Sequence, residues 1–190
     1  MVSASQLRGG MAIRFEGQNY KVISAEYHPG QGKMGGVTHA RLRNLSTGTF
    51  WEHSFRADLK LETLPIEKRP MEFLYREGDD CHFMDPNTFE QVAVPAALIG
   101  EQAALLTESM RVPVEFLGEQ PVSVEMPEFL EVRIADTAPP SHQISDGPWK
   151  PAKLESGLEV MVPPFIKTGD AIRLDLATMK YMDRVKPPAK

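Results

Sequence analysis

Residues 20–43 read YKVISAEYHPGQGKMGGVTHARLR and combine two alternating runs with a glycine-rich centre. Alternation of apolar and polar residues is typical of a half-buried β-strand, so we expect antiparallel arms over 23–27 and 38–43. Four glycines among the seven residues from Gly30 to Gly36 permit backbone angles that are closed to other residues. The stretch therefore predicts a β-hairpin whose long tip carries one cationic side chain, Lys33.

Short alternating runs of this kind recur along the whole chain, and helical spacing is scarce. The runs at 11–15 and 20–23 flank a turn and predict a further tight hairpin. Helical spacing occurs over 95–110, where Gly100 weakens the helix. A single short helix between the strands of a small barrel is the arrangement of an OB-fold. The sequence therefore predicts an all-β protein made of small barrels.

A connection between domains is indicated at 62–70, which reads ETLPIEKRP and mixes two prolines with charges. Alternation resumes after it at 71–75, and a last set of alternating runs begins at 130–134. We therefore predict three barrels in a row, at 1–64, 65–127 and 128–190.

The net charge of -5 is distributed unevenly over these three parts. The first has 8 Lys and Arg against 5 Asp and Glu, the second has 4 against 12, and the third has 9 against 9. A basic first part joined to a strongly acidic second part favours a protein that touches RNA phosphates at one end and repels them elsewhere. The alternative is that the charge varies by chance over solvent-exposed faces and has no function.

The composition indicates an ordinary globular protein, with 42% hydrophobic and 25% charged residues. No apolar run approaches the length that spans a bilayer, and the first residues lack the pattern of a secretory signal, so we expect a cytoplasmic protein with no membrane partner. The single cysteine, Cys81, excludes an internal disulfide framework and a multi-cysteine metal site.

The residues that enzymes use are present but lack the spacing of a known site. The five histidines are scattered, without the intervals of metal ligands. The run from Gly30 to Lys33 lacks the full spacing of a phosphate-binding loop, and a strand rather than a helix is expected after it. The acidic cluster at 77–85 falls in a turn, where solvated charge is favoured over calcium binding. We therefore predict no catalytic residue, metal site or cofactor.

Three parts of the chain carry motifs at recognisable intervals. Residues 150–169, KPAKLESGLEVMVPPFIKTG, contain Lys-x-Ala, Gly, Val-x-Val-Pro and Gly in succession. In the middle part, the short stretches 75–78, 83–85 and 88–91 contain Tyr, Gly, Phe-Met and Thr-Phe-Glu-Gln. Together with the glycine-rich lysine tip, these motifs resemble those of the bacterial elongation factor P family, and the similarity extends over the whole chain.

The resemblance implies an SH3-like (KOW-like) N-terminal barrel followed by two OB-fold barrels, in an elongated shape similar to tRNA. It also implies a monomeric, non-enzymatic translation factor that binds both subunits of the ribosome between the peptidyl and exit sites. Such a factor positions peptidyl-tRNA and stimulates peptide bond formation at stalled, proline-rich sequences.

The resemblance also assigns site residues. Lys33 matches the tip lysine, which a lysine-modifying enzyme extends in some relatives, whereas others carry a modified arginine or an unmodified tip. The rest of the tip, facing the tRNA acceptor end, is Pro29, Gly30, Gln31, Gly32, Met34, Gly35 and Gly36. The implied RNA-binding residues are Arg41, Arg43, Tyr181 and Arg184. The structural alternative for the arginines is a solvated charge on a strand, and for Tyr181 it is packing within the barrel.

The chain departs from the family pattern in two places. The tip is about two residues longer than the common Pro-Gly-Lys-Gly form. When it is aligned from Pro29, Gln31 takes the usual lysine position, and Lys33 lies at the apex only when the alignment is centred on the tip. The loop at 139–149 lacks the Gly-Asp-Thr stretch through which relatives reach the exit-site codon. These departures leave a paralogue that serves other stalling motifs as one alternative. A general OB-fold RNA-binding protein is another, although it would need a basic groove lined with stacking aromatics.

Overall fold

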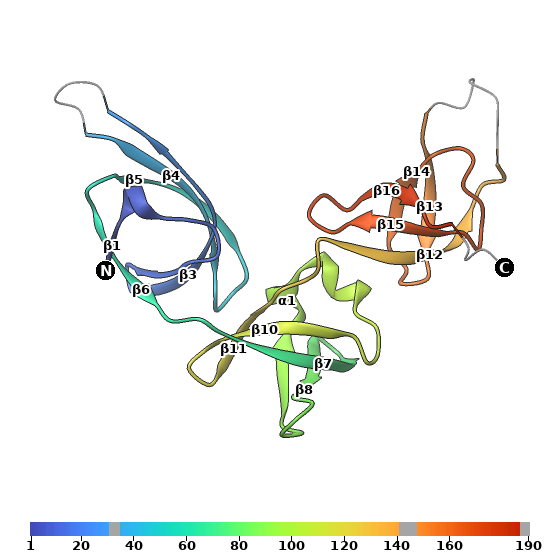
Figure 1. The fold of residues 1–190 in the computed structure, drawn as a ribbon, viewed down its shortest axis with the longest axis horizontal. Coiled ribbons are helices and arrows are strands. Elements are labelled where there is room, and N and C mark those ends of the chain that lie inside the picture. Colours follow the sequence, from blue (N-terminus) through green and yellow to red (C-terminus); the bar gives the residue numbers. More distant parts are fainter. Residues whose placement is uncertain (31–34, 141–147, 187–190) are drawn as a thin grey trace. The chain divides into compact units, whose positions relative to one another are not determined.

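The computed structural model describes residues 1–30, 35–140 and 148–186, in three antiparallel sheets (Figure 1). Backbone contacts divide the chain into two compact units. The first comprises residues 1–103 and 107–125, and it holds the first two sheets. The second comprises residues 104–106 and 126–190, and it holds the third sheet.

The first sheet has the strand order β1-β6-β2-β3-β4-β5. Its elements are β1 (Val2–Ser3), the 3-10 helix η1 (Ala4–Gln6), β2 (Ala12–Phe15), β3 (Gln18–His28), β4 (Val37–Asn44), β5 (Phe50–Arg56) and β6 (Lys60–Leu64). Alternate residues of these strands, among them Ile13, Val22, Leu42 and Phe55, form one buried cluster. Burial of this apolar face holds the sheet together, because each such side chain contributes about 1.5–3 kcal/mol when it leaves water.

The strands β3 and β4 form the long hairpin that the alternating pattern predicts (Figure 1). Their pairing runs from Tyr20 opposite Asn44 to His28 opposite Val37, with a register shift between Val22 and Ser24. Such an irregularity increases the local twist of a strand pair. The outward-facing residues of both strands are mostly exposed, whereas Thr38, near the end of the hairpin, is still buried and pairs with the core residue Phe55.

The second sheet has the order β11-β10-β7-β8-β9, and its edge strands β11 and β9 contact each other, so the sheet curls into a barrel. Its elements are β7 (Glu67–Glu77), β8 (Asp80–Met84), β9 (Gln91–Pro95), α1 (Ala96–Ile99), the 3-10 helix η2 (Glu101–Leu105), β10 (Arg111–Leu117) and β11 (Gln120–Val124). The helix expected over 95–110 is interrupted at Gly100, whose φ of 84° is incompatible with a continuous helix.

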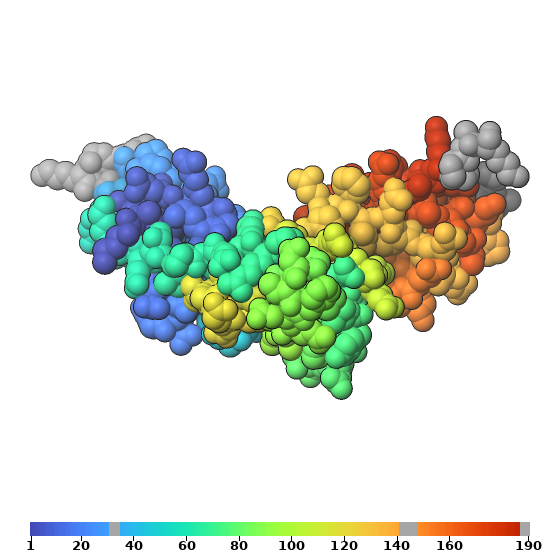
Figure 2. Space-filling model, turned by 60° about the horizontal axis from the view of Figure 1, so that its bottom comes forward, coloured from blue at the N-terminus to red at the C-terminus, as the bar shows by residue number. Residues whose placement is uncertain are grey.

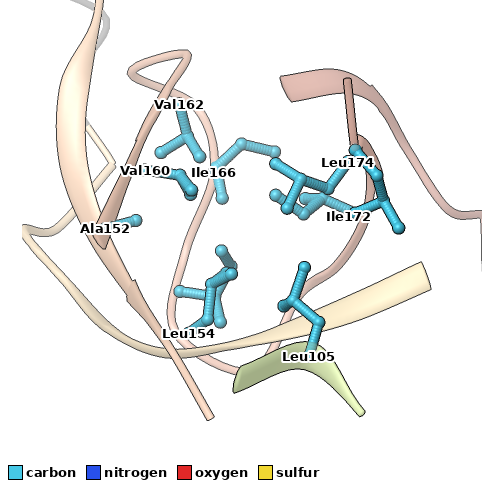
Figure 3. Packing of buried hydrophobic residues seen from close by; sticks show 10 residues of the cluster. Leu105, Ala152, Leu154, Val160, Val162, Ile166, Ile172 and Leu174 are labelled. Carbon is cyan, nitrogen blue, oxygen red and sulfur yellow. The ribbon is translucent and has the colours of Figure 1, made fainter. Parts of the chain in front are cut away.

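The third sheet has the order β14-β13-β12-β15-β16, and its edge strands β14 and β16 also contact each other. Its strands are β12 (Phe129–Thr137), β13 (Lys150–Leu154), β14 (Glu159–Val162), β15 (Ala171–Asp175) and β16 (Lys180–Arg184). Leucine, isoleucine and valine side chains fill its interior (Figure 3). Leu105, at the end of η2, joins them, because residues 104–106 belong to the second compact unit. The prediction of an all-β protein made of small barrels is confirmed, and the domain limits near 64 and 127 stay a prediction.

Candidate nucleic-acid interface

The predicted hairpin tip lies partly outside the described residues. Gln31, Gly32, Lys33 and Met34 fall there, so their roles stay predictions. Among the flanking residues, Gly36 stands where a Cβ atom would lie 2.5 Å from the Tyr27 ring and 2.9 Å from the His28 carbonyl oxygen. A side chain at this position would therefore force the strands apart just below the tip.

The outer face of β4 carries the two predicted RNA-binding arginines. Arg41 and Arg43 alternate with Ala40 and Leu42, which point into the core. Their guanidinium carbons lie 4.8 and 5.6 Å from the ring centre of Phe50 on β5, a ring that is 56% exposed. Cation–π attraction of this kind holds an arginine in place while its N–H groups stay available. Sequence reasoning missed Phe50, because its contact with both arginines depends on the β4–β5 register.

Arg43 differs from Arg41 because it also bonds within the protein. It donates to the Gly48 carbonyl oxygen at 3.4 Å and to the Ala97 carbonyl oxygen at 3.0 Å. Burial lowers the pKa of Arg43, and the charge of Glu115 acts in the opposite direction. Arg41 is exposed, so Arg41 is the better placed of the two to meet a phosphate.

A polar hollow lies beside Arg41 on the same face. It is lined by Ser24, Ala25, Glu26, His39, Ala40, Arg41, Glu52, His53 and Ser54. Within it, His39 Nδ1 and Ser54 Oγ share a hydrogen bond of 2.7 Å. Donors and carboxylate acceptors side by side suit a ligand that has both phosphate and hydroxyl groups, as an RNA backbone does. The lining comes from three strands, so only the sheet register brings it together.

The second compact unit contains the other predicted contacts, Tyr181 and Arg184 on β16. Tyr181 is half-buried against the core, with its ring centre 6.2 Å from that of Trp149. Burial, and next the charge of Asp183, raise the pKa of Tyr181. Arg184 Nη2 lies 3.3 Å from Oδ1 of the buried Asp170. Tyr181 therefore has a packing role whatever else it does, while the partly exposed Arg184 retains access to solvent; RNA contact by both stays a prediction.

Two further observations concern the described part of the chain. None of its His, Cys, Asp and Glu side chains gather in threes in a way that could hold a metal ion. None of its helices has the length and apolar character needed to cross a membrane.

Comparison with known proteins matches three family models in succession. The KOW-like domain of elongation factor P matches residues 3–61, its OB domain matches residues 66–124, and its C-terminal domain matches residues 130–184. The matches together cover most of the chain and fall on the three sheets in order.

Full-length relatives agree with these matches. Elongation factor P of Acidobacterium capsulatum is 37% identical over 184 residues, which is 96% of this chain and 98% of that protein. The factor of Pelotomaculum thermopropionicum is 37% identical over 97% of this chain and 100% of its own length. A solved structure, eukaryotic translation initiation factor 5A from Methanococcus jannaschii, superposes with a TM-score of 0.44 at 17% identity, covering 65% of this chain and 94% of that one. From its family models and its full-length relatives, the chain belongs to the elongation factor P family.

Proposed function

We propose that this translation elongation factor binds the ribosome between the peptidyl and exit sites, positions peptidyl-tRNA and stimulates peptide bond formation at stalled polyproline sequences. One observation carries the proposal. The long β3–β4 hairpin carries Arg41 on its exposed face, where Phe50 of β5 and the polar hollow adjoin it, and the sequence that connects its two strands contains Lys33. This arrangement suits a probe that follows an RNA backbone and delivers one cationic side chain beyond it.

The physical reason for such a factor lies in proline itself. Its ring fixes φ near -65°, which makes it a rigid and poorly placed reactant. Holding the reacting groups in a productive geometry lowers the entropic part of the barrier, and a misplacement of about 1 Å can cost roughly 100-fold in rate. The factor then needs no catalytic group of its own, because the ribosome performs the chemistry.

The charge distribution is consistent with binding in one orientation. The first part of the chain is basic and the second carries 12 acidic against 4 basic residues. Phosphates attract the first and repel the second. We propose three domains, 1–64, 65–127 and 128–190, acting as a cytoplasmic monomer that contacts both ribosomal subunits, with Tyr181 and Arg184 as the RNA contacts of the third.

A reconstituted translation reaction tests this function. Two reporters, one with three consecutive prolines and one with three alanines, are translated with and without the protein. We expect the protein to raise full-length product from the proline reporter alone, and Lys33→Ala to abolish the gain. Equal output from the proline reporter with and without the protein would reject the proposal.

Mass spectrometry of the natively expressed protein defines the state of the tip. Added mass on Lys33 would identify a lysine-modifying enzyme as a partner. An unmodified Lys33 in a protein that still stimulates the proline reporter would show that the bare ammonium group is sufficient.

A further inference from the structure

A buried carboxylate joins the first sheet to the second within the first compact unit. Glu115 lies on β10 between Val114 and Phe116, and its side chain is only 2% exposed. Lys21 Nζ, from β3 of the first sheet, donates to Glu115 Oε2 at 2.5 Å. Lys68 Nζ lies farther away, 3.9 Å from Oε1. A charge at this depth must be paired, so the Lys21 contact fixes which part of β3 lies against β10.

The opposite strand of the hairpin is attached at the same level. Lys21 pairs directly with Arg43 in the β3–β4 register. Arg43 reaches the second sheet's helix α1, where its Nη2 donates to the Ala97 carbonyl oxygen at 3.0 Å. Both strands of the hairpin are therefore held to the second sheet at one rung, the Lys21–Arg43 pair. Strand β3 is held through an ion pair and β4 through a charge-assisted hydrogen bond.

Close packing surrounds this rung. Gly48, with φ of 75°, lies so near α1 that a Cβ atom would be 2.4 Å from the Ala97 carbonyl oxygen. An apolar seam also forms at this junction, consisting of Ala12, Leu45 and Val122 with the partly buried Leu64, Ile66 and Leu117. In the space-filling view, the yellow atoms of the β10–β11 region lie directly against the first sheet (Figure 2).

We infer that Lys21 and Arg43 are positioning residues. They hold the base of the hairpin against the second sheet and thereby fix the direction in which the hairpin extends. The inference rests on the proposed function of the hairpin tip. The seven residue-to-residue steps from Lys21 to His28 span about 23 Å at ~3.3 Å per step. A rotation of about 10° at the rung would thus move the strand ends by roughly 4 Å, well beyond the ~1 Å that a reacting geometry tolerates.

The use of charge at this junction favours positioning over stability. Well-packed apolar residues often replace a buried ion pair without loss of stability. An apolar seam, however, has no preferred direction, whereas an ammonium–carboxylate contact defines one register between two strands. Replacing both charges by methionine therefore separates the two roles, since packing is kept and direction is lost.

The test compares Lys21→Met, the double variant Lys21→Met/Glu115→Met, and the control Lys60→Met. Lys60 is an exposed lysine of β6 that donates to Ser3 Oγ, away from the seam. Residual dipolar couplings of backbone amides report whether residues 2–64 and 67–124 share one alignment tensor. The proline reporter measures function, and thermal unfolding measures stability.

We expect one shared tensor in the unaltered protein and in Lys60→Met, and two different tensors in both Lys21 variants. Proline-reporter stimulation should fall at least about fivefold in the double variant while its thermal stability stays near that of the unaltered protein. A double variant that keeps one tensor and full stimulation would overturn the inference. Failure of the unaltered protein to stimulate the proline reporter would instead reject the proposed function. The dipolar couplings would still test whether Lys21 and Glu115 fix the orientation of the two sheets.

Discussion

Replacement of Gly48 by alanine should destabilise the first compact unit far more than the same change at Gly17. Both glycines have positive φ, 75° and 77°, so an L-residue at either costs about 1–2 kcal/mol. At Gly17 the added Cβ meets nothing within 4 Å, whereas at Gly48 it would lie 2.4 Å from the Ala97 carbonyl oxygen and 3.0 Å from the carbonyl carbon. The atoms that it meets belong to backbone, so relief requires α1 to move.

Forced overpacking of this kind costs about 1–3 kcal/mol beyond the backbone term, which gives about 2–5 kcal/mol for Gly48→Ala. Urea unfolding can be followed by the fluorescence of Trp51 in a Trp149→Phe background, since these are the two tryptophans of the chain. The same background carrying Gly17→Ala is the control, with an expected loss of about 1–2 kcal/mol. Equal losses at the two positions would refute the close approach of the Gly48 turn to α1.

Three further changes test the interface and one turn. Arg41→Ala should weaken ribosome binding and reduce the slope of log K against log salt by about 1, measured by titration at several salt concentrations, because one phosphate contact is lost; an unchanged slope would exclude Arg41 from phosphate contact. Phe50→Leu should lower affinity about twofold to fivefold through loss of about 0.5–1 kcal/mol of cation–π attraction, with unaltered melting temperature as the control for folding; unchanged affinity would show that the ring does not support the arginines. The backbone N–H groups of Asn87 and Thr88 donate to the carboxylate of Asp85 and lower its pKa. These hydrogen bonds therefore stabilise the fold above the ordinary carboxyl pKa of about 3.9, and this stabilisation is lost as the pH falls through the lower pKa of the folded state. Asp85→Ala should therefore be less stable than the unaltered protein at pH 6 and nearly equal to it in strong acid, by urea unfolding, and a difference independent of pH would contradict that linkage.

The strands and the hairpin could be predicted from the sequence because their signals are local. The alternation on either side of Pro29–Gly36 marks β3 and β4 whatever the rest of the chain does. The helical pattern over 95–110 was a weaker guide, since it includes Gly100, which adopts a positive φ and ends α1. Local spacing alone therefore predicted one helix where the protein has two short pieces.

The junction between the first two sheets could not be predicted in this way. Alternation places Glu115 opposite to the core residues Val114 and Phe116, which is the pattern of a solvent-facing side chain. Its burial arises only because β3 brings Lys21 against it, a contact between residues 94 apart in the chain. Gly48 is similar, because nothing in the residues around it indicates that it approaches Ala97.

The most direct test of the proposed function is the rate of a single peptide bond, measured by rapid quench on ribosomes with peptidyl-prolyl-tRNA in the peptidyl site and prolyl-tRNA as acceptor. We predict that the protein raises this rate at least about tenfold, leaves the rate of a phenylalanine pair unchanged, and loses its effect in Lys33→Ala, because positioning of a rigid reactant is the contribution that the hairpin makes. An equal acceleration of both pairs, or an unaltered rate for the proline pair, would contradict the proposal.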